Sequence, residues 1–308
     1  MATLRSVGSL RAAAVAFAAA AIVAQILFPL ARGAVLDAVT AAVVILLAAS
    51  ALAHSLSTRG VRFTAALAGA AIGGGFAAEA AGVATGFPFG CYTYALDRLG
   101  PSIAEVPLVV PLAWAAGSYP VWCAVSAITS RWTGWHRSLI RVPLVTVTIT
   151  AWDLYLDPQM VTMGYWTWCP ADLTLPGVGQ IPLTNFAGWL LVSFAIAVAL
   201  ESAERSGRFS HKVDMAERWL QARSDAVPLV LFGWTWLGSA LAHAVFLNIR
   251  YPEAGLQYSA AFGLLGMAIT GVPLAFWLWN SRRSQRSQPT STRPPAGQHT
   301  TSSEELAR

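Results

Sequence analysis

Three carboxylic acids and one amide lie in stretches of the chain that are otherwise apolar. Glu79 lies in an Ala- and Gly-rich stretch, Asp153 and Asp157 end another apolar stretch, and Asn185 opens the next. An acid in the hydrocarbon region of a membrane is costly, so each of these acids is a candidate functional residue. Burial raises the pKa of a carboxyl group, and a second carboxylate close by raises one of the two further. The set could therefore donate a proton near neutral pH.

Aromatic side chains gather around the same positions. They are candidates for binding an apolar substrate and comprise Phe89, Tyr92, Tyr94, Trp152, Trp166, Trp168 and Trp189. Their π faces could stabilise a developing cation and line an apolar cleft. Trp and Tyr also form belts at membrane interfaces, and that interpretation is favoured for single residues such as Trp122 and Trp277. For Trp166 and Trp168 both interpretations stay open.

The composition predicts that these residues are carried by transmembrane helices. Only 11% of the 308 residues are charged, against about 25% in soluble domains. A spanning helix needs roughly 20 mostly apolar residues. Eight stretches qualify: 12–30, 35–54, 62–84, 106–129, 141–156, 183–200, 227–249 and 257–279. The first could instead be a signal peptide, but its apolar run is long for one. We expect an all-α, multi-pass bundle over residues 1–280.

The basic residues test this topology independently. Seventeen of the twenty fall in one alternating set of loops and termini, and the opposite set holds only Arg32, Arg98 and Arg250. Cytoplasmic loops carry the excess of Arg and Lys, so an even number of spans is predicted, with both termini in the cytoplasm. The expected location is the cell membrane. Residues 281–308 are rich in Ser, Thr, Gln, Pro and Arg, which is typical of a disordered cytoplasmic tail.

Depth estimates bring the acids together. At 1.5 Å per residue, Glu79 lies roughly 26 Å along a helix that starts inside, and Asp153 lies roughly 18 Å beyond Arg141. His243 lies roughly 24 Å along its own helix, where a packing role is favoured. The aromatic connections 86–94 and 152–168 flank the same layer. We therefore expect one polar, aromatic-lined layer near the outer interface.

Several classes of chemistry find no support. The five histidines form no cluster of the kind that binds a di-iron centre, and no phosphate-binding Gly-rich motif is present. Asp153 and Asp157 have the spacing of prenyltransferase aspartates, but the loop that follows them contains no Lys or Arg to neutralise a diphosphate. Cys91 and Cys169 could form a disulfide on one face, although unpaired cysteines are favoured. No cofactor, metal or nucleic acid is expected.

Motifs between residues 75 and 200 resemble those of a family of membrane carotenoid-biosynthesis proteins that includes the bacterial and archaeal carotenoid 1′,2′-hydratases. The resembling elements, in order, are Glu79, Thr85 to Gly90, Tyr92, Tyr94, Val106-Pro107, Trp152-Asp153, Asp157-Pro158, Trp166-x-Trp168, Ile181-Pro182, Asn185-Phe186 and Gly188-Trp189. The run Pro176 to Gln180 departs from the pattern, where a tyrosine and a shorter segment are expected. That departure bears on substrate choice more than on the fold.

The resemblance implies addition of water across the terminal double bond of an acyclic ψ end group, without a cofactor. Such an alkene must be protonated to a tertiary cation, which water then traps. We expect Asp153 or Glu79 to be the proton donor, with the other acid and Asn185 positioning water and Asp157 completing the acid set. The partners expected are a carotenoid and the bilayer, with other membrane enzymes of the pathway as further candidates.

Two alternatives remain. A carotenoid end-group cyclase would use the same cation but lose a proton, giving an isomeric product. A transporter or carotenoid-binding protein would need no acid chemistry, but a transporter is expected to show internal repeats with interrupted helices, and none is evident.

Overall fold

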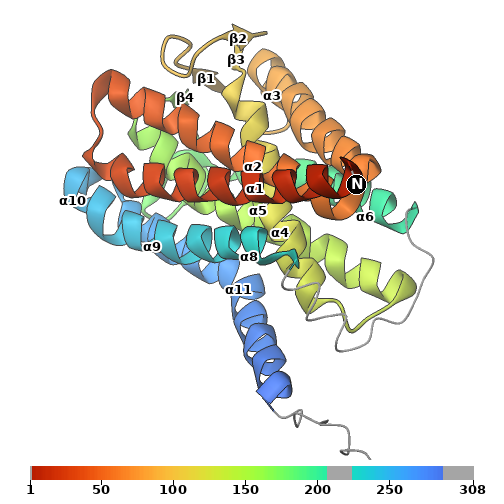
Figure 1. The fold of residues 1–308 in the computed structure, drawn as a ribbon. Helices are drawn as coiled ribbons and strands as arrows, with labels where there is room; N and C mark the ends of the chain where they lie inside the picture. Colours follow the sequence, from red (N-terminus) through yellow and green to blue (C-terminus); the bar gives the residue numbers. More distant parts are fainter. Residues whose placement is uncertain (1, 207–223, 287–308) are drawn as a thin grey trace, which may run out of the picture.

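The computed structural model describes residues 2–206 and 224–286, and nearly all regular structure in them is helical (Figure 1). Within these described residues, seven helical stretches are long and apolar enough to cross a membrane: Val7–Leu30, Gly33–Thr85, Val109–Ile128, Gly134–Thr162, Leu183–Ser206, Ala226–Arg250 and Leu256–Ser281. The predicted all-α, multi-pass membrane fold is confirmed.

The second stretch contains two of the eight predicted spans. It comprises α2 (Gly33–Leu67), the π-helix η2 (Ala68–Gly73) and α3 (Gly74–Thr85). Its 53 residues would extend about 80 Å as one straight helix, far beyond a hydrocarbon core of about 30 Å. Gly60 breaks it with φ +81° and ψ 176°, and the hydroxyl oxygens of Ser55 and Thr64 lie 2.9 Å apart across the break. The chain therefore reverses at Gly60, and seven stretches accommodate eight spans.

The remaining helices pack around α4 (Val109–Ile128) and α5 (Gly134–Thr162). Helix α1 (Ala2–Leu27) lies along α2, where the Ser50 hydroxyl donates to the Ala14 carbonyl oxygen at 2.9 Å. Helix α6 (Leu183–Ser206) and α11 (Leu256–Arg286) both pack against α5. In the sequence, α6 and α11 are separated by a stretch that comprises α8 (Ala226–Gly233), η3 (Trp234–Gly238), α9 (Ser239–Leu241), η4 (Ala242–Leu247) and α10 (Asn248–Arg250).

Helix α5 extends past the predicted span of 141–156, because its acids face protein rather than lipid. It continues through Asp157 to Thr162, and both Asp153 and Asp157 are buried. Helix α11 likewise continues to Arg286, five residues past the predicted start of the tail. Residues 287–308 of that tail lie outside the described part of the chain.

Three short strand pairs occupy the connections between helices, and the all-α prediction did not include them. They are β1 (Tyr92–Tyr94) with β4 (Trp166–Trp168), β2 (Ser102–Ile103) with β3 (Val106–Pro107), and β5 (Thr174–Leu175) with β6 (Val178–Pro182), all antiparallel. The first four strands lie near one another in Figure 1. They belong to connections at the end of the bundle that the arginine distribution places outside.

Buried ion pairs connect helices at the opposite end of the bundle. The Arg141 guanidinium lies 2.5 Å from Glu201 and 3.2 Å from Glu204, and Arg59 lies 2.9 Å from Asp225. Arg59 and Arg141 were counted in the sequence as basic residues of the cytoplasmic loops, yet both are buried. Each pairs with an acid from another helical stretch, so these charges join helices.

Candidate active site

Glu79 on α3 is held by three hydrogen bonds in the interior of the protein. The Tyr92 and Tyr94 hydroxyls donate to its Oε2 atom at 2.6 and 2.7 Å, and the Trp114 indole Nε1 donates to Oε1 at 3.1 Å. The side chain is 6% exposed. Both carboxyl oxygens are thus engaged by donors from β1 and α4.

Asp153 and Asp157 lie on one face of α5, as residues four apart on a helix do, and one amide bridges them. The Asn185 Nδ2 atom on α6 donates to Asp153 Oδ2 at 2.8 Å and also to Asp157 Oδ2. The Trp166 indole donates to Asp157 Oδ1 at 2.9 Å. Asp153 Oδ1 is buried and has no hydrogen-bond partner within the described part of the chain. Of the six carboxyl oxygens of these three acids, this one alone lacks a donor there.

The β1–β4 pair forms an aromatic platform over the acids. Tyr92 pairs with Trp168 and Tyr94 with Trp166, and alternate residues of a strand point to the same face. The ring centroids of Tyr92 and Trp168 are 4.8 Å apart, and those of Tyr94 and Trp166 are 5.6 Å apart. From this platform the two tyrosine hydroxyls donate to Glu79, and the indole of Trp166 donates to Asp157.

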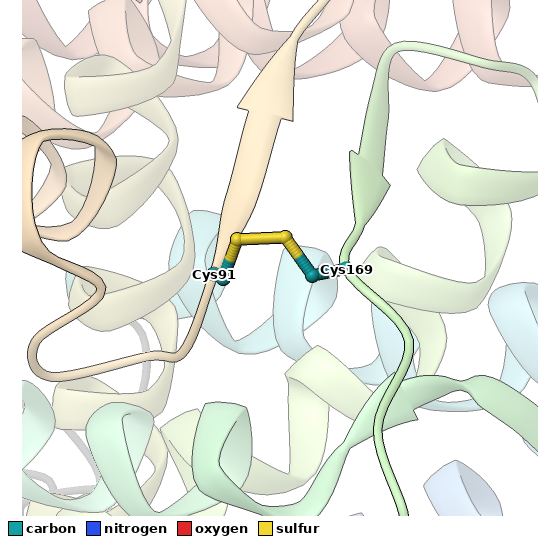
Figure 2. Close-up of a disulfide and its surroundings, with 2 residues drawn as sticks. All are labelled: Cys91 and Cys169. Carbon is teal, nitrogen blue, oxygen red and sulfur yellow. A yellow bond between two sulfur atoms is a disulfide. The ribbon is translucent and has the colours of Figure 1, made fainter.

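A disulfide between Cys91 and Cys169 closes the end of this platform (Figure 2). The preference for unpaired cysteines was therefore wrong. The pairing depends on the register of β1 against β4: the Cys169 amide donates to the Cys91 carbonyl oxygen at 2.9 Å, next to the Tyr92–Trp168 pair. Two strands of three residues give no periodicity from which that register could be predicted.

The acids and the platform enclose a cavity with an empty volume of about 650 Å³, which we call the acid cavity. Besides apolar side chains, it is lined by Glu79, Phe89, Tyr92, Tyr94, Trp114, Asp157, Trp166, Trp168, Asn185 and Trp189. Asp153 does not line it but accepts a hydrogen bond from Asn185, which does line it and which also donates to Asp157. Nine of the eleven residues predicted for the site therefore line one cavity, and Asp153 lies directly behind it.

Trp152 is placed elsewhere. Neighbours on a helix point about 100° apart, so Trp152 and Asp153 face different directions. Trp152 lines a second cavity, and its ring is nearly perpendicular to that of Trp189, with the two centroids 5.9 Å apart. Trp152 stays a predicted substrate-binding residue, and its position would place that contact in the second cavity.

Trp114 belongs to the site and was not predicted from the sequence. Its ring stacks on Trp189 with centroids 4.0 Å apart, and it packs against Gly75, where an added Cβ would lie 2.6 Å from the indole. In a long apolar run, an indole that faces the core looks the same as one that faces lipid. The signal available was the Gly73–Gly75 run at the junction of η2 and α3, where the missing side chain of Gly75 makes room for a large ring.

The two tyrosines of the platform act as neutral donors. Burial, together with the charge of Glu79, raises the pKa of Tyr92 and of Tyr94 above the ordinary value. Each hydroxyl therefore keeps its proton and donates it toward Glu79 throughout the physiological pH range.

His243 is separate from the acids. It is buried and bonded to Ser259 at 2.9 Å and to Gln159 at 3.0 Å, as expected for a packing residue. Among the described residues, no group of three or more His, Cys, Asp or Glu side chains is placed to hold a metal ion.

Fold and site together define a polytopic membrane protein with buried acids facing an aromatic, largely apolar cavity. Residues 39–252, more than two thirds of the chain, match the family described as carotenoid biosynthesis protein, and the chain belongs to that family. The resemblance inferred from the motifs is confirmed, and the matched region includes every residue of the site.

A bisanhydrobacterioruberin hydratase of Haloarcula japonica is 32% identical to the chain over 123 residues. The matched stretch makes up 40% of this chain and 39% of that protein, so the likeness covers only about two fifths of the relative's length. No solved structure matches the chain.

Proposed function

We propose that the protein is a carotenoid hydratase that adds water across the terminal double bond of an acyclic ψ end group. Three observations support this: membership of the carotenoid biosynthesis family, a relative named as a hydratase, and buried acids at an aromatic cavity. The observation that carries the proposal is the unpaired Asp153 Oδ1 atom behind the cavity wall, because hydration of an alkene must begin with a proton donor.

The acid unit is Asp153, Asn185 and Asp157. Asp153 holds the proton, and the amide of Asn185 keeps its carboxyl group next to Asp157, which lines the acid cavity. The proton passes from Asp153 to Asp157, and the O–H bond of Asp157 breaks as that residue gives the proton to the less substituted carbon of the terminal double bond. The π electrons form the new C–H bond, and the positive charge appears on the tertiary carbon.

Glu79 is the base of the reaction. With three donors on its two oxygens, its carboxylate form is stabilised, and in that form it can attract a cation and orient a water molecule. The water oxygen attacks the tertiary carbon, and the proton it releases goes to Glu79. Proton exchange with solvent then restores both acids, so no oxidant, reductant or cofactor is consumed.

The aromatic rings stabilise the cation before water captures it. Trp114 and Trp189 form one stacked wall, and Tyr92 with Trp168 form part of the platform. A cation within about 6 Å of such a ring is stabilised by roughly 0.5–2 kcal/mol, more when water is excluded. The apolar and aromatic side chains that form most of the lining of the acid cavity limit water near the cation.

Its substrate is lipid-soluble, so we place the enzyme in the cell membrane, where other membrane enzymes of the pathway would supply the acyclic carotenoid. The disulfide supports an orientation with the acid cavity near the outer face, since disulfides persist in oxidising compartments.

The direct test is expression in a host that makes lycopene and γ-carotene, followed by chromatography and mass spectrometry of the pigments. Hydration predicts a more polar pigment heavier by one water with an unchanged visible spectrum, because the terminal double bond lies outside the conjugated system. An isomeric product with a shifted spectrum would instead identify a cyclase. No new pigment from correctly inserted protein would contradict the proposal for these two substrates.

A further inference from the structure

A second and larger cavity adjoins the acid cavity. We call it the long cleft; its empty volume is about 1640 Å³, more than twice that of the acid cavity. The two cavities share five lining residues: Thr40, Val44, Ala113, Leu156 and Met160. They therefore meet along a common wall, and a ligand in one can continue into the other.

The long cleft is elongated. On the 226–250 stretch its lining begins at Leu231 and ends at Leu247, sixteen residues later, which corresponds to a length on the order of 20 Å. Its outer end is lined by Phe28 and Phe246, and its inner end by Val121 and Phe232. A chain that is long, narrow and extended fits this shape better than a compact ligand does.

The chemistry of the lining agrees with the shape. None of the described residues that line the long cleft carries a charge. Aromatic rings occur along it, among them Trp152, Tyr155 and Trp234. Such a surface offers flat π faces to a conjugated chain and nothing to neutralise a phosphate, so a phospholipid would have to leave its headgroup outside.

We propose that the long cleft binds the conjugated polyene of the carotenoid while the terminal double bond lies in the acid cavity. The polyene passes the wall formed by Leu156 and Met160, and Trp152 lies beside it. This assignment rests on the proposed function for its choice of reacting end, but the binding of a polyene can be measured on its own. It also explains why Trp152 lies near the site without lining the acid cavity.

A matched pair of substitutions in one short helix tests the assignment. Ala242 lines the long cleft, whereas Ala244, two residues on, is exposed and lines none of the cavities described here. Ala242→Phe should fill the cleft, and Ala244→Phe adds the same bulk outside it. Should Ala242→Phe fail to fold, Gly238→Leu replaces it, because an added Cβ at this cleft residue comes no closer than 3.4 Å to Trp234.

Two probes separate binding from chemistry: lycopene, and farnesol, a short isoprenoid that ends in the same trisubstituted double bond. We expect Ala242→Phe to weaken lycopene binding at least tenfold by tryptophan fluorescence quenching, with Ala244→Phe unchanged. Turnover of farnesol should stay within twofold in both variants, since it needs only the acid cavity.

Equal lycopene affinity in the two variants would overturn the assignment. So would native mass spectrometry that finds a phospholipid retained by the purified protein and not displaced by lycopene. If the wild type hydrates neither probe but Ala242→Phe alone loses lycopene binding, the hydratase proposal fails and the polyene site stands.

Discussion

Trp114 and Trp189 stack with ring centroids 4.0 Å apart and an interplanar angle of 25°, although they come from α4 and α6. The Trp114 indole also donates a hydrogen bond to Glu79 at 3.1 Å. One ring thus connects the aromatic wall of the acid cavity to the carboxylate at its centre. Ring stacking and hydrogen bonding at Trp114 can be separated experimentally, because phenylalanine keeps an aromatic ring and removes the N–H donor.

Trp114→Phe should lower turnover roughly tenfold, since a lost hydrogen bond to a charged group costs about 1.5–3 kcal/mol and leaves Glu79 less firmly oriented. The measurement is the rate of hydrated product per inserted protein. Trp122→Phe is the control, because the Trp122 indole also donates to a buried carboxylate, Glu204, but at the other end of the bundle. Equal losses in the two variants would mean that general destabilisation, rather than the contact with Glu79, sets the rate.

Asp153→Asn should abolish hydration, with a fall of about 10²–10⁴-fold in turnover, the usual contribution of a general acid. The amide has nearly the same shape but no acidic proton, so the protein should still reach the membrane. Asp37→Asn is the matched control. Asp37 pairs with Arg98 at 2.6 Å and is partly exposed, so its loss should change turnover less than threefold. Wild-type turnover by Asp153→Asn would remove Asp153 from the mechanism.

The helices could be predicted because the bilayer imposes a single requirement on all of them. Each span must be long and apolar, and its loops carry a charge bias, so both signals can be read locally. The reversal at Gly60 illustrates this: hydropathy and Arg59 with Arg62 place a loop there, although the helix is interrupted at little more than one residue. The predicted depths of Glu79 and Asp153 used helical rise alone.

The contacts within the site could not be predicted in the same way, because they depend on tertiary register. Which tyrosine faces which tryptophan is decided by the pairing of two three-residue strands, too short for a periodic pattern. Trp152 also depends on tertiary structure. It is next to Asp153 in sequence but lines the long cleft, because adjacent helical residues point in different directions.

Alkaline pH should destabilise the protein through Tyr92 and Tyr94. Because the pKa of each is raised on folding, the stability this provides is fully present below the unfolded pKa of about 10 and is lost as pH rises above it. Thermal unfolding measured from pH 8 to 11.5 should show a shallower alkaline fall in the melting temperature for Tyr92→Phe than for the wild type. Tyr258→Phe removes a half-exposed tyrosine, so the melting temperature of this variant should fall with pH as steeply as that of the wild type. Parallel curves for all three proteins would contradict this interpretation.

The disulfide gives a prediction that tests both the platform and the orientation of the protein. Cys91→Ser with Cys169→Ser should destabilise the protein by about 2 kcal/mol or more, because the bridge closes a long loop in the unfolded chain across 78 positions. Turnover should also fall, since the bridge is adjacent to Tyr92 and Trp168. Cys123→Ser, at the free and buried cysteine, is the control for loss of a thiol.

Orientation follows from where the bridge can form. If the strand pairs face the oxidising side, wild-type protein from normal cells should migrate differently on reducing and non-reducing gels, and protein from a host lacking extracytoplasmic thiol oxidation should not. Cys123→Ser should retain the mobility difference, and the double variant should lose it. A bridge that forms equally well without the oxidation machinery would place the platform, and with it the acid cavity, on no particular side. The arginine distribution would then be the sole support for the orientation.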